Sequence, residues 1–351
     1  MPSSPKPPAG GPSLRTIAAS AGVTSMTVSL ALRDHPSISS ATRARIKRLA
    51  AEQGYRPDPA VTKLMHHLRA RRAQRTHSSL GGLRTQAPSI AAQGYFYGDL
   101  VAAGARHRAE LLGFRYEEIL IDAAGLTPRR LQRIIANRGV EGLVVLPLNT
   151  PMKLSSLLDW AAISAVAATS AVLEPRLHTV MPDHFVNVTE LCRQLSEQGL
   201  KRIGLATHAE HIVRVQQRMA AAHAWHNVVA GVPPIPPLMI QRDALDEPAL
   251  LAWIEAHALQ AVISDSEFDL NLIAAALPAR LRRKLVLVST NIHPPLAQHR
   301  GIDEKPALVG AAAVDVLAAM IQRGERGLPE SPRTILIAGE YTEPVRAKRT
   351  P

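Results

Sequence analysis

The 351-residue chain contains a single cysteine, Cys192. One thiol excludes an internal disulfide framework and a zinc site built from several cysteines, and it agrees with a protein of the reducing cytosol. We expect Cys192 to be a small buried apolar residue on a helix.

The sequence also lacks long apolar runs. No stretch approaches the roughly 18 uninterrupted apolar residues of a membrane helix, and residues 1–12, rich in proline, serine and glycine, lack the apolar core of a signal peptide. We interpret residues 1–12 as a disordered lead-in and expect a cytoplasmic protein with no membrane partner. The hydrophobic content of 46% is ample for a buried core of one large or two medium units.

Local signatures of common enzymes are missing as well. The sequence has no G-x-x-x-x-G-K-[ST], G-x-G-x-x-G or G-x-S-x-G motif, so neither a phosphate cradle nor a nucleophile elbow is indicated. We therefore predict no catalytic residues. The histidine pairs have no cysteine or glutamate at ligand spacing, so we predict no metal site and no cofactor. These pairs are His66 with His67, His208 with His211, and His223 with His226.

Positive charge, by contrast, is abundant and unevenly placed. Residues 1–76 hold 13 lysines and arginines against three acids, a net charge of +10, whereas the remaining chain holds 28 basic and 26 acidic residues, a net charge of +2. A nearly neutral body with a strongly basic head indicates a local polyanionic partner. Nucleic acid is the favoured partner.

The basic region contains a helix-turn-helix pattern. Ser13 is a predicted N-cap, and Gly22 is predicted to end the first helix because a residue without a Cβ turns freely into the left-handed conformation. Between them an apolar stripe recurs at helical spacing: Leu14, Ile17, Ala18 and Ala21. Val23 is then expected to fill the space between two helices, and Thr24 to cap the second.

The second helix is predicted to turn Val28 and Leu32 inward. The residues left facing outward are Ser25, Met26, Ser29 and Leu30. A third helix is predicted after a Ser39 cap, ending at Gly54, with one apolar face: Ile46, Leu49 and Ala50. Three short helices make a small core that suits a DNA-reading head, although the same pattern fits a helical subdomain that binds no DNA.

The run from Ser13 to Leu64 resembles the DNA-binding head and hinge of the lac repressor family of bacterial transcription regulators. The matching residues occur in order and without a gap: Ile17-Ala18, Ala21-Gly22-Val23-Thr24, Thr27-Val28-Ser29, Ile38-Ser39, Thr42-Arg43, Ile46, Gly54-Tyr55, Pro57 and Leu64. The resemblance implies a set of residues that face DNA. They are Thr24, Ser25, Met26, Thr27, Ser29, Leu30, Arg33, Ser39, Thr42, Tyr55 and Leu64.

The segment after the head is predicted to be a short helix from about Pro59 to Arg69, entered through an extended Pro57-Asp58-Pro59 stretch. The resemblance makes it a hinge helix that orders on DNA, pairs with its dimer mate and inserts Leu64 into the minor groove. From the residues alone, a plain linker helix whose Leu64 packs on the core is the alternative. We interpret His77 to Gly82 as a flexible joint.

From about residue 83 onward, short apolar runs alternate with helical stretches. The predicted strands lie at 116–121, 142–146, 178–181, 202–206, 261–264 and 285–289, and the predicted helices at 127–137, 184–198, 248–257 and 308–321. Continuous apolar strands separated by helices predict a doubly wound α/β core. This region is similar to the family's two-lobed core of the periplasmic-binding-protein type, which implies three crossovers, near residues 168–176, 292–304 and 330–334.

In such a fold, ligands bind in the cleft outside the carboxyl ends of the strands. The resemblance assigns Arg218, Asp265 and Asn291 to this cleft. Ala221 replaces an expected glycine, and Asn291 an expected aspartate, which sets the cleft apart from a typical sugar site. Phe96 and Tyr97, just before Asp99, offer either ring stacking on a ligand or ordinary loop and core packing.

We expect four segments: a lead-in (1–12), a helix-turn-helix head (13–58), a hinge helix with a basic linker (59–82) and a two-lobed core (83–351). The function that they indicate is a homodimeric regulator, most simply a repressor, with double-stranded operator DNA and a small polar effector as partners. The alternative is a small-molecule binding protein or vestigial sugar enzyme that carries a basic head.

Overall fold

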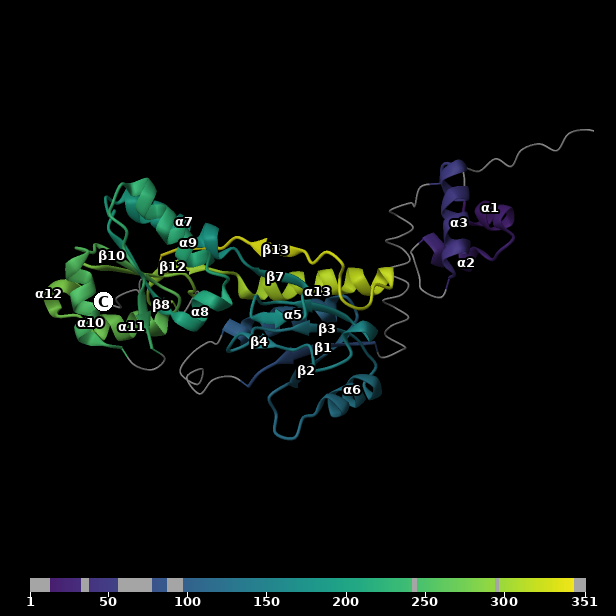
Figure 1. The fold of residues 1–351 in the computed structure, drawn as a ribbon, viewed down its shortest axis with the longest axis horizontal. Helices are drawn as coiled ribbons and strands as arrows, with labels where there is room; N and C mark the ends of the chain where they lie inside the picture. Colours follow the sequence, from purple (N-terminus) through teal and green to yellow (C-terminus); the bar gives the residue numbers. More distant parts are fainter. Residues whose placement is uncertain are drawn as a thin grey trace, which may run out of the picture.

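The computed structural model describes residues 13–32, 38–55, 78–86, 97–241, 245–293 and 297–343. Three short helices form the head, which comprises α1 (Leu14–Ala21), α2 (Ser25–Leu32) and α3 (Ser40–Glu52). Two larger sheets with helices on their faces form the rest of the described chain (Figure 1). The chain is therefore an α/β protein with a helical head, as the sequence predicted.

The helices α1 and α3 of the head begin at their predicted caps. The Ser13 side chain accepts from the Thr16 backbone N–H at the start of α1, and Gly22 ends that helix with a φ of 61°. Ser39 caps α3 in the same way through the Thr42 N–H. Ile17, Val28 and Ile46, one from each helix, are fully buried against one another.

The first sheet, with the helices on its faces, is called the N-lobe. Its strands run in the order β13-β7-β5-β3-β1-β2, and all neighbours are parallel. The strands are β1 (Ser79–Arg84), β2 (Arg115–Leu120), β3 (Val140–Val145), β5 (Ser164–Ala167), β7 (His178–Pro182) and β13 (Thr334–Ile337). Helices α5 (Tyr97–Leu111) and α13 (Pro306–Arg323) share one apolar core with this sheet, and α6 (Pro128–Asn137) packs into a second.

A small accessory sheet accompanies the N-lobe. It pairs β4 (Met152–Lys153) with β6 (Val172–Glu174), and a single 3-10 turn, η2 (Trp160–Ala162), precedes β5.

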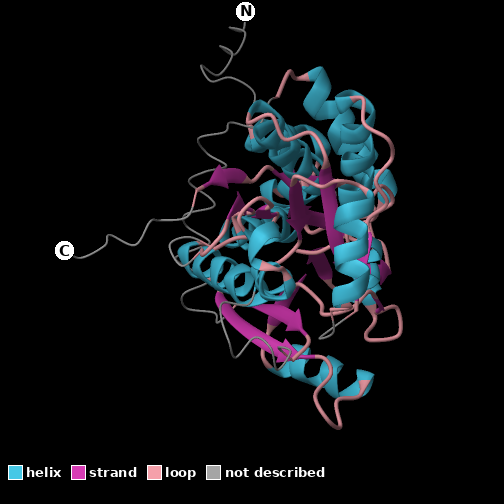
Figure 2. Cartoon of the chain, turned by 90° about the vertical axis from the view of Figure 1, so that its left-hand side faces the viewer, coloured by secondary structure: helices cyan, strands magenta, loops and turns pink. Residues whose placement is uncertain are grey.

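The second sheet and its helices form the C-lobe. Its strand order is β14-β12-β11-β10-β8-β9, parallel except for the antiparallel pair β12–β14. The strands are β8 (Ile203–His208), β9 (Leu238–Ile240), β10 (Ala261–Ser264), β11 (Val286–Ser289), β12 (Arg300–Asp303) and β14 (Glu340–Thr342). The helices are α7 (His184–Glu197), α8 (Ala209–Arg214), α9 (Arg218–Ala230), α10 (Glu247–Ala256), α11 (Glu267–Ala276) and α12 (Ala279–Arg282). Figure 2 shows the strands with helices around them.

The chain passes between the lobes three times, as predicted, and the second crossover lies at the edge of its predicted range while the first and third lie elsewhere. Strand β7 still belongs to the N-lobe, so the first crossover lies between Pro182 and His184 rather than in 168–176. The second lies between β12 and α13, near Glu304, and the third between β13 and β14, near Gly339 rather than in 330–334. A strand's sheet is decided by its pairing partners, which local sequence does not specify.

Residues Ser79 to Gly82 were predicted to be part of a flexible joint, and this prediction is wrong. They form most of β1, a buried strand between β2 and β3. The two glycines are there because of packing: a Cβ on Gly81 would lie 2.7 Å from Leu143 Cδ2, and one on Gly82 would lie 2.3 Å from the Tyr116 hydroxyl. The N-lobe therefore begins at residue 79 and not at 83.

Helix α13 is long and apolar, with 18 residues and a mean hydropathy of 1.3. Those values satisfy the length and composition of a membrane span, but Val309, Val314 and Leu317 are fully buried in the core that α13 shares with α5. In this structure α13 is a core helix of the N-lobe.

Candidate functional site

The outward face of α2 is the first candidate site. The Thr24 hydroxyl accepts from the Thr27 backbone N–H at 3.1 Å, which fixes the start of α2. Met26 is 68% exposed, while Ser25, Thr27, Ser29 and Leu30 are partly exposed. A short helix that presents small polar and apolar side chains to solvent has the form of a helix that enters the major groove.

The other residues predicted to face DNA have varied environments. The Ser39 hydroxyl donates a hydrogen bond to the Thr42 hydroxyl at 2.9 Å, at the start of α3. Tyr55 packs against the core of the head, and its backbone N–H donates to the Ala50 carbonyl at 2.9 Å. Arg33 and Leu64, with the predicted hinge helix, lie outside the described residues.

The second candidate site lies at the carboxyl ends of the C-lobe strands, where the sequence analysis expected a cleft. Asp265 follows β10, Asn291 follows β11, and Arg218 is the first residue of α9. Tyr97 begins α5 in the N-lobe, and its ring centroid lies 6.4 Å from that of His293 in the C-lobe. Phe96 lies outside the described residues.

Each of these side chains carries a buried polar atom without a hydrogen-bond partner among the described residues. The atoms are the Tyr97 hydroxyl, Arg218 Nε, Asp265 Oδ1, Asn291 Oδ1 and His293 Nδ1. A buried polar group without a partner costs about 1–3 kcal/mol. A ligand with several donors and acceptors would satisfy them, so the chemistry of this set fits a polar small molecule.

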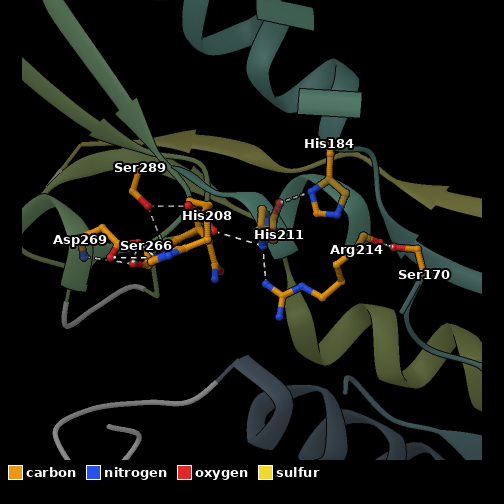
Figure 3. Close-up of polar contacts among 11 residues, drawn as sticks. Ser170, His184, His208, His211, Arg214, Ser266, Asp269 and Ser289 are labelled. Carbon is orange, nitrogen blue, oxygen red and sulfur yellow. Dashed lines mark hydrogen bonds and ion pairs between the residues drawn. The ribbon is translucent and has the colours of Figure 1, made fainter. Parts of the chain in front are cut away.

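The sequence analysis missed two histidine–carboxylate pairs at this site, and Figure 3 shows His208 beside Asp269 and His211 beside Arg214. His208 Nε2 lies 3.1 Å from Asp269 Oδ2, and Asp269 also accepts from the Ser266 hydroxyl at 2.7 Å. His211 Nδ1 lies 3.1 Å from Asp265 Oδ2. The His208/His211 spacing had been considered only for a metal; the structure instead gives each ring its own carboxylate.

The other described histidine pair is structural. His223 Nε2 lies 2.8 Å from the Ile203 carbonyl, and His226 Nε2 lies 3.1 Å from the Lys201 carbonyl, so both rings fasten α9 to the region of β8. Cys192 is buried on α7, as predicted, and burial raises the pKa of its thiol to about 12.

Burial sets the electrostatics of the cleft. It is the largest effect on Asp265 and raises the pKa of its carboxyl, against the opposing influence of His208 and Arg214. Burial also lowers the pKa of His211 well below 6.5, helped by the nearby positive charge of Arg214. The hydrogen bond to Asp269 raises the pKa of His208. At neutral pH, His211 is therefore a neutral ring.

The joint between α8 and α9 carries backbone strain. Gln216 and Gln217 both adopt left-handed conformations, with φ values of 55° and 62°. For residues other than glycine such a conformation costs about 1–2 kcal/mol each, and strain of this kind gathers at binding sites and switch segments. Gln216 and Gln217 lie between Arg214 and Arg218, so their backbone conformation determines how the two arginines are placed relative to each other.

Comparison with known proteins decides what the head is. Residues 13–58 match the family model described as bacterial regulatory proteins, lacI family. The head therefore matches the DNA-binding domain of that family. The chain is 25% identical over 210 residues to the HTH-type transcriptional regulator CelR of Thermobifida fusca, a match that covers 59% of this chain and 59% of that regulator.

Solved structures of the lacI family share the fold of the whole chain. A transcriptional regulator CelR–cellobiose complex matches with a TM-score of 0.57 and 20% identity, over 94% of this chain and 98% of that chain. The lac repressor dimer bound to operator and the anti-inducer ONPF matches with a TM-score of 0.56 and 17% identity, over 95% and 98%. At these identities the likeness shows the fold alone.

Proposed function

We propose that the chain is a homodimeric, sequence-specific DNA-binding transcription regulator, most simply a repressor. The observation that carries this proposal is a lacI-family head with a solvent-facing α2, joined to a two-lobed core whose cleft holds unsatisfied polar atoms. The outward residues of α2 read bases, and the basic residues of the head contact phosphates. The proposed head is 13–58, followed by a hinge and linker to residue 78.

The proposed effector is a small polar molecule, with a sugar as the first class to test. Tyr97, Arg218, Asp265 and Asn291 are the proposed contacts, because each has a buried polar atom that needs a partner. One structural neighbour is a complex with cellobiose, which makes that disaccharide a suitable first probe. The proposal assigns no catalytic activity to the cleft and places the protein in the cytoplasm, where operator DNA lies.

Selection of bound genomic fragments tests the proposal. The full chain should enrich a short two-fold symmetric site, and a chain lacking residues 1–76 should enrich nothing while retaining any ligand binding by the core. Repeating the selection with a panel of sugars that includes cellobiose should identify conditions that change site occupancy. If neither the full chain nor its head enriches a defined site, the proposal fails, and a binding protein with a basic head takes its place.

Salt dependence supplies an independent test. If six to ten phosphates are neutralised per complex, operator affinity should fall about 10³–10⁵-fold between 50 and 200 mM salt. The net charge of +10 in residues 1–76 is the physical reason for this expectation. A flat salt response would contradict an electrostatic contact between the head and DNA.

A further inference from the structure

Three histidine–carboxylate pairs lie between the cleft and the crossovers. Two are the pairs of His208 with Asp269 and His211 with Asp265. The third joins His184, the first residue of α7, to Glu304, with His184 Nδ1 3.1 Å from Glu304 Oε1. All three carboxylates are buried. The His184 and His211 rings meet edge to face with centroids 6.3 Å apart, so the second and third pairs are in contact (Figure 3).

The third pair is part of a bridge among all three crossovers, which we call the crossover clamp: His184, Asn187 and Glu304. The Asn187 side-chain amide donates to Glu304 Oε1 at 3.3 Å, and Asn187 Oδ1 accepts from the Gly339 backbone N–H at 2.9 Å. His184 and Asn187 follow the first crossover, Glu304 lies at the second, and Gly339 at the third. A change at His184 therefore reaches every connection between the lobes.

At the other end, His211 holds α8 in place. Its Nδ1 is in contact with Asp265 and also with the Arg214 guanidinium. The backbone carbonyl of Arg214 accepts from the Ser170 hydroxyl of the N-lobe at 2.5 Å, so the end of α8 is tied across the cleft. The strained residues Gln216 and Gln217 follow directly. Loss of the contact between Arg214 and His211 would allow Gln216 and Gln217 to leave their left-handed conformations.

We propose that His211 and His184 form a proton-sensitive link between the cleft and the crossover clamp, so that acidification releases α8 and changes the angle between the lobes. The proposal deepens the proposed function by assigning a regulatory input to the same cleft. The charged and titratable groups that face His211 are Arg214 on α8, His208 at the end of β8, Asp265 after β10, Asp269 on α11 and His184 on α7.

The chemistry of the proposed switch follows from the two contacts of His211 Nδ1, one with Asp265 and one with Arg214. A neutral His211 can accept from the Arg214 guanidinium at Nδ1. Once the ring takes a proton from solvent, Nδ1 becomes a donor that suits Asp265, and the imidazolium repels Arg214. Burial and the charge of Arg214 lower the pKa of His211 below 6.5, which sets the range in which the change occurs. Cleft ligands that bind Arg214 would favour the same rearrangement, so proton and ligand binding would be coupled.

The test measures the distance between the lobes without DNA, so it is independent of operator binding. Arg133→Cys on α6 and Ala252→Cys on α10 place two exposed thiols in different lobes for fluorescence transfer. The native Cys192 is buried, with a thiol pKa raised to about 12, and does not compete for the labels. In the labelled parent, transfer efficiency should shift as the pH falls below 6.5.

The variants decide which groups cause the shift. His211→Gln should lose the pH-dependent shift in transfer efficiency. Asp265→Asn should alter that shift, and it serves as the second variant if His211→Gln folds poorly. In His184→Gln, hydrogen exchange of 209–215 should still respond to pH while the interlobe distance does not. His107→Gln, at an exposed position on α5, is the matched control and should behave as the parent. A parent distance that is constant from about pH 7.5 down to the lowest pH at which the parent stays folded, or a shift that persists in His211→Gln, would overturn the proposal.

Discussion

On α2, Met26 and Leu30 lie one helical turn apart on the solvent side, where a groove-reading helix usually carries polar groups. Met26 has 68% of its surface exposed, so it is not part of the apolar core of the head. Apolar side chains in the major groove gain most against the methyl group of thymine. The pair therefore predicts an operator that places thymine beneath it.

We expect Met26→Gln or Leu30→Arg to change which half-site is preferred, because each new group can form hydrogen bonds to base edges worth about 1–3 kcal/mol of discrimination. Selection from randomised half-sites measures the change. Ala44→Gln, at an exposed position on α3, is the control and should keep the parent's preference. Identical preferred sites for parent and α2 variants would contradict base reading by this pair.

Individual residues also show where sequence reasoning succeeds and where it stops. The family resemblance placed Asp265 and Asn291 after two predicted strands, and each does follow one, β10 and β11. The histidine partner of Asp265 could not be predicted, since His211 lies 54 positions away in the sequence. The two residues meet only through the pairing of β8 with β10. Gly81 and Gly82 misled the prediction because the same residue serves flexible joints and tightly packed strands.

At the scale of elements, the local signals were strongest where caps and apolar runs coincide. The predicted strand Ala261–Ser264 and the helix ending at Asn137 have their predicted bounds, the latter capped by Thr127. The first and third crossovers were misplaced because β7 and β13 belong to the N-lobe sheet only through their pairing: β7 pairs with β5 and with β13.

The crossing of α5 and α13 gives an element-scale prediction. A Cβ on Gly104 would lie 2.0 Å from the Ala307 carbonyl oxygen, and one on Gly310 would lie 2.0 Å from that of Val101. Gly104→Ala must push the two backbones apart, and overpacking of this kind costs about 1–3 kcal/mol. Urea unfolding should show the loss, whereas Ala103→Ser, at an exposed position of α5, should unfold as the parent does.

The hinge helix carries a second element-scale prediction, although it lies outside the described residues. A helix from about Pro59 to Arg69 is shorter than the roughly 12–15 residues that are helical alone in water, so it should form only with a partner helix and DNA. We expect Leu64→Ala to keep dimerisation and salt-dependent nonspecific binding but to lose operator affinity and DNA bending together.

Fluorescence transfer between the duplex ends measures that bending. If Leu64→Ala bends the operator as the parent does, Leu64 is a packing residue. Leu68→Ala, one turn along the predicted helix, is the control for general loss of helix and should bend DNA as the parent does.

For the whole molecule, burial of histidines predicts how stability depends on pH. Burial lowers the pKa values of His178, His211, His223, His293 and His299 below 6.5. As the pH falls below 6.5 these rings take up protons in the unfolded chain before they do so in the folded one, so the free energy of unfolding decreases. His208 acts in the opposite sense, since Asp269 raises its pKa and its contribution is lost as pH rises through that value.

We therefore expect the melting temperature to fall as the pH is lowered from about 7 to 5.5. Over this range the five histidines with lowered pKa values outweigh His208, whose pKa is raised. Thermal melts in that range provide the measurement. His223→Gln should make the fall shallower, and His208→Gln should make it steeper, because each removes one contribution of known sign. A melting temperature that rises on acidification would contradict the assignment.

The interleaving of the two lobes bears on the order in which a growing chain can fold. Residues 184–303 supply every strand and helix of the C-lobe except β14, as one continuous insertion. The N-lobe, by contrast, waits for α13 and β13, since Val101 and Ala105 share their core with Val309 and Leu317. On the ribosome the lobe translated second can therefore finish almost entirely before the lobe translated first. Removal of everything after residue 303 should leave a foldable C-lobe beside an N-lobe with an open apolar face.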